Sequence, residues 1–368
     1  MAQPVAARSF LGTCILVGLS IAVLFAVDSF LARTERTESR VEAARLFSQG
    51  QNFLRQGNSA GAVESIKDAI EIERGNRDYQ RTLAEAQLAA GKAADAEATL
   101  NALLASDSTD GRANLIMARV QVNQGRFPEA ISYFHRAIYG QWPGDAAANR
   151  LRARFELIDL LAQRDSKEDL LAELLPVEDQ APRDLNARVR MGRLLLQAGS
   201  PLRAADVFRG ILQEAPANAA AHAGLGNAEF AQSNYLAAQR DYESALRLTP
   251  NDLAIRKRLD LCDQLLTLDP TVRGLYPEDR LSRSRKLLEL TVDDATQCSG
   301  QNPSAEMRVL LEEAAKALKH RSSADRQSAT AESNLDIAEQ MWQFRGKDCT
   351  QPPAKDSPLA LVLDRLAR

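Results

Sequence analysis

Residues 219–250 read AAAHAGLGNAEFAQSNYLAAQRDYESALRLTP, and this stretch decides the fold. Small residues fill its first half, helix-forming residues run through both halves, and a proline closes it. Proline stops a helix because it lacks an N–H group and its ring clashes with the preceding turn. The stretch therefore predicts helical structure that stops at Pro250.

The same pattern recurs along the chain at a fixed interval. Three glycines, each before an apolar helical pattern, are 34 residues apart: Gly57, Gly91 and Gly125. Alanines follow at the same interval: Ala62, Ala96 and Ala130. Ala204 and Ala238 are again 34 apart, while the distance from Ala130 to Ala204 leaves six residues beyond two periods. That excess falls in 151–184, where the repeat is degenerate. A fixed period of this length predicts a stack of repeats, since one repeat cannot bury its apolar face alone.

This register resembles the tetratricopeptide repeat, which has small residues at positions eight, twenty and twenty-seven, a large one at twenty-four and proline at thirty-two. The repeat that begins at Ala219 supplies them in full: Gly226, Ala238, Ala245, Tyr242 and Pro250. Earlier repeats match less completely and begin at Ala43, Arg77, Gly111 and Leu185. The resemblance covers about 43–250. It implies a right-handed helical solenoid of about five repeats plus the degenerate one, in which the small residues let paired helices approach closely.

The rest of the chain is also predicted to be helical, so the fold class is all-α. Residues 251–269 read as a polar helix that caps the solenoid, and 270–368 as a C-terminal helical domain. Within that domain, helices are expected over 277–297, 304–320, 324–344 and 357–366, the first three running up, down and up.

The N-terminal segment predicts a membrane anchor. Residues 10–27 read FLGTCILVGLSIAVLFAV without a charge, which is long enough to cross a bilayer. We expect an N-terminal tail over 1–8 and a single transmembrane helix over 9–32. A cleaved signal peptide is the alternative, although its apolar core is usually shorter. Basic residues flank this segment on both sides, so they do not decide which end of the helix faces the cytoplasm.

The cysteines bear on the compartment. Cys298 and Cys349 each follow a helix that runs in the same direction, so the topology allows a disulfide between them; two unrelated thiols are the alternative. A disulfide would place this domain in an oxidising space and favours an extracytoplasmic, periplasmic soluble part. Cys262 reads as a small buried apolar residue.

Composition and motifs argue against several function classes. Lys and Arg number 46 against 49 Asp and Glu, which disfavours a nucleic-acid partner. No phosphate-binding loop, HExxH helix, nucleophile elbow or CxxC pair occurs. We therefore expect no enzyme activity, no cofactor and no metal site. His222 reads as a packing residue of its repeat.

The family resemblance implies a binding groove. In this family the first helix of each repeat lines a concave face through positions two, five, nine, twelve and thirteen. The candidate polar residues at those positions are Arg55, Arg81, Arg112, Arg119, Asn123, Asn186, Arg193 and Asn227. Asp78 and Glu85 are the acids among them. Arginine pairs with carboxylates through two hydrogen bonds, so an acidic peptide would suit this groove. The alternative is that these arginines are merely solvated.

These observations predict a membrane-anchored adaptor or scaffold that binds a protein or peptide partner through the groove. The clamp of the family's chaperone-binding members is not matched, because Phe47 stands at its first position. The alternative function is a structural subunit that self-associates, as a homo-oligomer, through the C-terminal helical domain.

Overall fold

A computed structural model describes residues 5–178, 184–300, 303–349, 352–354 and 357–367. The side chains of 5–18, 20–23, 26, 31 and 32 lie outside that description. By its internal contacts the chain divides into two units, Met1–Leu160 and Leu161–Arg368, and each is described by itself. Every regular element in the described ranges is a helix, and only one isolated β-bridge, between Asp110 and Gln141, is recorded there.

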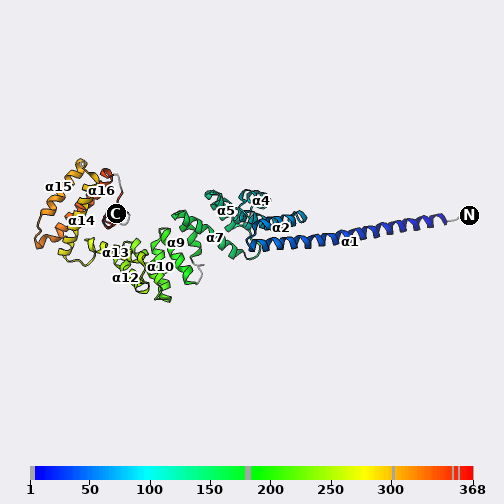
Figure 1. The fold of residues 1–368 in the computed structure, drawn as a ribbon, viewed down its shortest axis with the longest axis horizontal. Coiled ribbons are helices and arrows are strands. Elements are labelled where there is room, and N and C mark those ends of the chain that lie inside the picture. Colours follow the sequence, from blue (N-terminus) through cyan, green and yellow to red (C-terminus); the bar gives the residue numbers. More distant parts are fainter. Residues whose placement is uncertain (1–4, 179–183, 301–302, 350–351, 355–356, 368) are drawn as a thin grey trace. The chain divides into compact units, whose positions relative to one another are not determined.

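The first unit holds three helix pairs. Its helices are α1 (Val5–Arg55), α2 (Ser59–Ile72), α3 (Arg77–Ala89), α4 (Ala93–Ser106), α5 (Gly111–Asn123) and α6 (Phe127–Tyr139). The next helix, α7 (Ala146–Gln163), begins in this unit and ends in the second. Figure 1 shows α1 as one unbroken helix. The predicted anchor and the first helix of the first repeat thus share one element, because 28–42 contain neither glycine nor proline and are rich in helix-forming Arg and Glu.

The second unit holds two further repeat pairs and the C-terminal helices. After α8 (Lys167–Leu174) and a short 3₁₀ turn, η1 (Leu175–Val177), come α9 (Leu185–Gln197), α10 (Pro201–Glu214), α11 (Ala219–Ala231) and α12 (Tyr235–Leu248). The remaining elements are α13 (Leu253–Leu268), α14 (Pro277–Ser299), α15 (Ala305–Lys319), η2 (Ala324–Arg326), α16 (Gln327–Asp348) and α17 (Pro358–Leu366).

Each repeat is held together by a small residue set against a large one. A Cβ atom added at Gly192 would lie 2.5 Å from Cζ of Phe208, and one at Gly226 would lie 2.7 Å from Cδ1 of Tyr242. Both large side chains are almost fully buried. Positions eight and twenty-four of the repeat are therefore coupled, since the glycine leaves the space that the ring fills.

The turn between the two helices of a repeat needs a left-handed residue. Gly125 has φ +74°, which costs glycine nothing. In the last repeat this position is Ser233, which still adopts φ +62°. The shape of the turn is thus kept where the glycine is lost, at some cost in backbone strain.

The degenerate stretch 151–184 is still largely helical, in α7 and α8, and buried side chains lie on both helices: Ala153, Leu157, Leu161, Leu170 and Leu174. Trp142 stands where proline closes other repeats. Its indole N–H donates to the carbonyl of Ala137 at 2.8 Å. Its ring occupies the space that a Cβ at Gly111 would need.

The helix α13 packs on two cores rather than presenting a polar end. Ile255 and Cys262 lie in a cluster with Tyr242 of the last repeat. Leu265 and Leu268 belong to the core that α14, α15, α16 and α17 also share, around Leu287, Met307, Met341 and Leu363. The prediction of a polar cap was therefore wrong about this helix, because the C-terminal domain covers its outer face.

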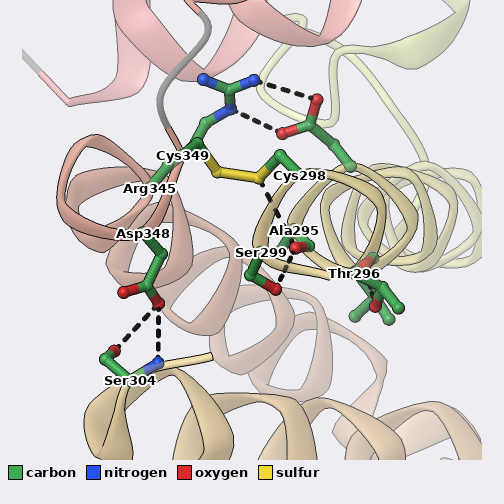
Figure 2. The surroundings of a disulfide bond; sticks show 10 residues. Ala295, Thr296, Cys298, Ser299, Ser304, Arg345, Asp348 and Cys349 are labelled. Atoms are coloured by element: carbon green, nitrogen blue, oxygen red, sulfur yellow. Dashed lines mark hydrogen bonds and ion pairs between the residues drawn. A yellow bond between two sulfur atoms is a disulfide. The ribbon is translucent and has the colours of Figure 1, made fainter. Parts of the chain in front are cut away.

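One end of the C-terminal domain is tied at three places (Figure 2). The structure joins Cys298 and Cys349 by a disulfide, with their Cα atoms 5.2 Å apart. Arg345 pairs with Asp294 at 2.6 Å. Asp348 accepts hydrogen bonds from the backbone N–H and the hydroxyl of Ser304, the N-cap of α15. These ties connect the ends of α14 and α16 with the start of α15.

Among the side chains that the structure describes, no helix offers a stretch both long and apolar enough to span a bilayer. The predicted span, 9–32, falls largely on residues whose side chains lie outside that description.

Candidate functional site

A pocket of about 280 Å³ lies in the first unit, among the first helices of successive repeats. The buried side chains of Leu115 and Ile116, on α5, form its apolar floor. Trp142 and Pro143 line another wall, just before α7. The polar lining comes from three helices: Glu85 on α3, Arg112 and Arg119 on α5, and Asn149 and Arg152 on α7.

Two of the three arginines are already paired with acids. Arg112 donates to Glu85 at 3.0 Å. Arg119 makes two hydrogen bonds to Glu156 of α7, at 2.7 and 2.8 Å, and this contact raises the pKa of the guanidinium further. A carboxylate held through two hydrogen bonds fixes the orientation of the arginine. These pairs set the shape of the pocket wall.

Arg152 differs from its neighbours. Its side chain is exposed, and within the described part of the chain it has no acid partner. Arg112 is engaged by Glu85 and Asp78 and Arg119 by Glu156, so Arg152 is the arginine of this lining that no described acid pairs with. The arrangement can therefore take one anionic group beside an apolar side chain, with Asn149 able to donate and accept hydrogen bonds.

Of the predicted groove residues, Arg112 and Arg119 line this pocket, and Arg112 also shares the partner Asp78 with Arg81. Arg81 lies outside the pocket and is paired twice, with Asp110 at 2.6 Å and with Asp78 at 2.7 Å. Arg55 donates to Asn52 on its own helix, and Asn123 is exposed. The first unit thus presents less free positive charge than the sequence alone indicates.

The other predicted groove residues belong to the second unit. Asn186 and Arg193 are exposed on α9. Asn227, on α11, accepts a hydrogen bond from the hydroxyl of Tyr242 at 2.9 Å. Their role in binding stays a prediction.

Sequence reasoning missed Trp142, Asn149 and Arg152. All three precede or lie within the degenerate repeat, where the register that maps groove positions is lost. The available signal was Trp142 itself, a large aromatic residue in a place reserved for proline.

The histidine of the last repeat has a hydrogen-bond partner at each ring nitrogen. His222 Nδ1 lies 3.3 Å from Asp241, and Nε2 lies 3.0 Å from the carbonyl oxygen of Pro216. Burial raises the pKa of Asp241, and the hydrogen bond from His222 opposes that rise. No group of three His, Cys, Asp or Glu side chains within the described ranges is placed to hold a metal ion.

Comparison with known families gives the relationship. One tetratricopeptide-repeat profile matches residues 53–120, and a second matches 115–164 and 189–253. The chain contains tetratricopeptide repeats. The resemblance to tetratricopeptide repeats is thereby confirmed, and the unmatched gap, 165–188, coincides with most of the degenerate stretch.

Solved tetratricopeptide-repeat structures resemble this chain in fold. YrrB, described as a TPR protein with an unusual peptide-binding site, is 20% identical, with 53% of this chain and 97% of that one covered and a TM-score of 0.42. The C-terminal part of a TPR protein from Cytophaga hutchinsonii is 10% identical over 82% of this chain and 97% of that one, with a TM-score of 0.44. The TPR2AB domain of yeast Sti1, in complex with pHSP90, is 14% identical over 79% and 98%, with a TM-score of 0.32. No protein with a curated description matches the chain.

Proposed function

We propose that this chain is a membrane-anchored adaptor that binds a protein or peptide partner in the pocket between α3, α5 and α7. Tetratricopeptide repeats generally mediate protein–protein interactions and peptide binding. The observation that carries the proposal is Arg152, a guanidinium without an acid partner among the described residues, at a pocket with an apolar floor.

The partner is a polypeptide segment with one carboxylate next to an apolar side chain. The carboxylate pairs with Arg152, and the apolar side chain lies on Leu115 and Ile116 beside Trp142. A strongly acidic segment is disfavoured because Glu85 and Glu156 already neutralise Arg112 and Arg119. This refines the acidic partner that the sequence indicates.

The membrane anchor belongs to the same proposal. Its support is the uncharged run 10–27 together with four apolar side chains of α1 that no other element covers: Leu24, Phe25, Val27 and Phe30 are 50–73% exposed. A bilayer would bury them. The pairing of Cys298 with Cys349 supports an oxidising, extracytoplasmic space for the repeats.

Peptide selection followed by charge reversal tests the proposal. The full chain, purified in mild detergent, is used to select binders from a displayed peptide library, and their affinities are measured by fluorescence anisotropy. Arg152→Glu should weaken binding at least about tenfold, the scale of one lost charge-assisted contact. Lys67→Glu on α2 is the matched control, an exposed cation in the same unit and outside the pocket.

Either of two results would overturn this assignment. One is a set of selected peptides that carries no carboxylate. The other is equal loss of affinity in Arg152→Glu and Lys67→Glu, which would mean that only the overall charge of the chain matters.

A further inference from the structure

A second pocket lies in the other unit and uses none of the groove residues. Its volume is about 430 Å³, which is within the range of small-molecule sites. It is formed by the turn before α12 and the first residues of that helix, the end of α13, the segment after α13, and α17. It therefore lies where the second helix of the last repeat meets the C-terminal helices.

Three arginines converge on this pocket, at positions 240, 273 and 365. Arg240 and Arg273 are exposed, and neither has an acid partner within the described ranges. Arg365 pairs with Asp269, the one acid in the lining. Three guanidinium groups against one carboxylate leave two positive charges in surplus.

The carboxylate of Asp269 is already paired and hydrogen-bonded within the protein. One of its oxygens meets Arg365, and the other accepts hydrogen bonds from the backbone N–H and the hydroxyl of Thr271, at 2.8 and 2.7 Å. Asp269 is only 4% exposed. It therefore cannot turn to neutralise Arg240 or Arg273.

Two more features of the pocket lining bear on the ligand. The Nε atom of Arg365 is buried and has no acceptor among the described residues. The N-cap of α12, Asn234, does not cap the helix with its side chain, because its amide donates to Glu229 at 2.9 Å. Leu236 and Ala237, in the first turn of this 14-residue helix, line the pocket. A helix N-terminus beside unpaired guanidinium groups favours an anion.

The remaining lining is apolar. Leu236 is 49% exposed at the pocket, while Leu266 and Val272 line it from α13 and the segment that follows. The ligand thus needs two parts, an anionic group for the arginines and an apolar body for these side chains.

We propose that this pocket binds a ligand in which a carboxylate or phosphate group is joined to an apolar body. This pocket shares no lining residue with the pocket between α3, α5 and α7, so each can be occupied or disrupted independently of the other. Because α12, α13 and α17 all contribute, binding also links the last repeat to the C-terminal helices.

Saturation-transfer NMR on the full chain in lipid nanodiscs tests the proposal, with empty nanodiscs as the background. The probes are hexanoate, hexyl phosphate and neutral hexanol. We expect saturable binding of at least one anion, with hexanol much weaker. Arg240→Glu with Arg273→Glu should weaken that binding at least tenfold, whereas Lys67→Glu and Arg152→Glu in the other unit should leave it unchanged.

The two anionic probes distinguish the sources of the charge, since preference for hexanoate indicates a carboxylate ligand and preference for hexyl phosphate a phosphate ligand. Lys257→Glu, an exposed cation on α13 outside the pocket, is the matched control for charge reversal in this unit. No saturable anion binding overturns the proposal. Equal binding of hexanol, or survival of binding in the doubly reversed variant with its thermal midpoint unchanged, overturns it as well.

Discussion

The Gly224→Ala substitution offers a sharp check on how the repeats pack. A Cβ atom at this position of α11 would lie 2.3 Å from Cζ and 2.4 Å from Cε1 of Phe208. The same ring also packs closely on Gly192, where an added Cβ atom would lie 2.5 Å from Cζ. Phe208 is fully buried, so the strain cannot be relieved by moving the ring into solvent.

The magnitude follows from two opposing terms. Overpacking of a well-filled core costs about 1–3 kcal/mol. Alanine in place of glycine in a helix interior regains about 1 kcal/mol. Because the ring is fully buried and already packs closely on Gly192, we expect the upper part of the first range, and hence a net loss of about 1–2 kcal/mol in the free energy of unfolding.

The matched control is Gly210→Ala on α10. A Cβ there would meet only Nη2 of Arg188 at 3.0 Å, the far end of a flexible side chain. This variant should be neutral or more stable by up to about 1 kcal/mol. Combining Gly224→Ala with Phe208→Leu should cost less than the sum of the two single changes, because the smaller side chain makes room.

Hydrogen exchange read by mass spectrometry on the full chain is the suitable assay, since it reports local opening of α9, α10 and α11. Faster exchange there in Gly224→Ala, with α14 and α16 unaffected, is the expected result. Equal exchange in Gly224→Ala and Gly210→Ala would refute the packing argument.

Three further predictions concern charge and sulfur. The hydrogen bond from Arg126 lowers the pKa of Glu97 in the folded chain. The ionised Glu97 therefore stabilises the fold above its unfolded pKa, and this stabilisation is lost as the pH falls through its folded pKa. The difference in urea midpoint between the unchanged protein and Glu97→Gln should thus disappear below the ordinary pKa of 4.5. Burial raises the pKa of Cys262 to about 12, so iodoacetamide at pH 8 should label it only after unfolding, and rapid native labelling would contradict its burial. Reduction of Cys298–Cys349, which are 51 residues apart, should lower the stability of the C-terminal domain by about 2–4 kcal/mol, and an unchanged thermal midpoint would show that the bond contributes nothing.

The repeats were predictable because their physics is local and periodic. A glycine such as Gly192 and a ring such as Phe208 stand at fixed positions, and a single register fixes which side chains meet. The helices of the C-terminal domain could be read for the same reason, within a few residues at each end. What α13 packs against could not, because its buried face depends on helices that come later in the chain.

The candidate site was only partly predictable from sequence. Arg112 and Arg119 follow from the repeat register, but their partners do not: Glu156 lies 37 positions from Arg119, in a helix whose register is lost. Trp142 takes the place of the closing proline, and the degenerate stretch that holds Arg152 follows no period. A pocket that is built by an irregular segment cannot be predicted from the repeat pattern, and the structure is required to find it.

Site-specific photo-crosslinking in the native host tests the central claim most directly. A benzoylphenylalanine introduced at Asn149, in the pocket between α3, α5 and α7, should give a discrete adduct with another polypeptide, and Arg152→Glu should abolish it. The same probe at Lys67, on α2, should give none. Absence of an adduct at Asn149, or the same adduct from both positions, would contradict the claim that this pocket binds the partner.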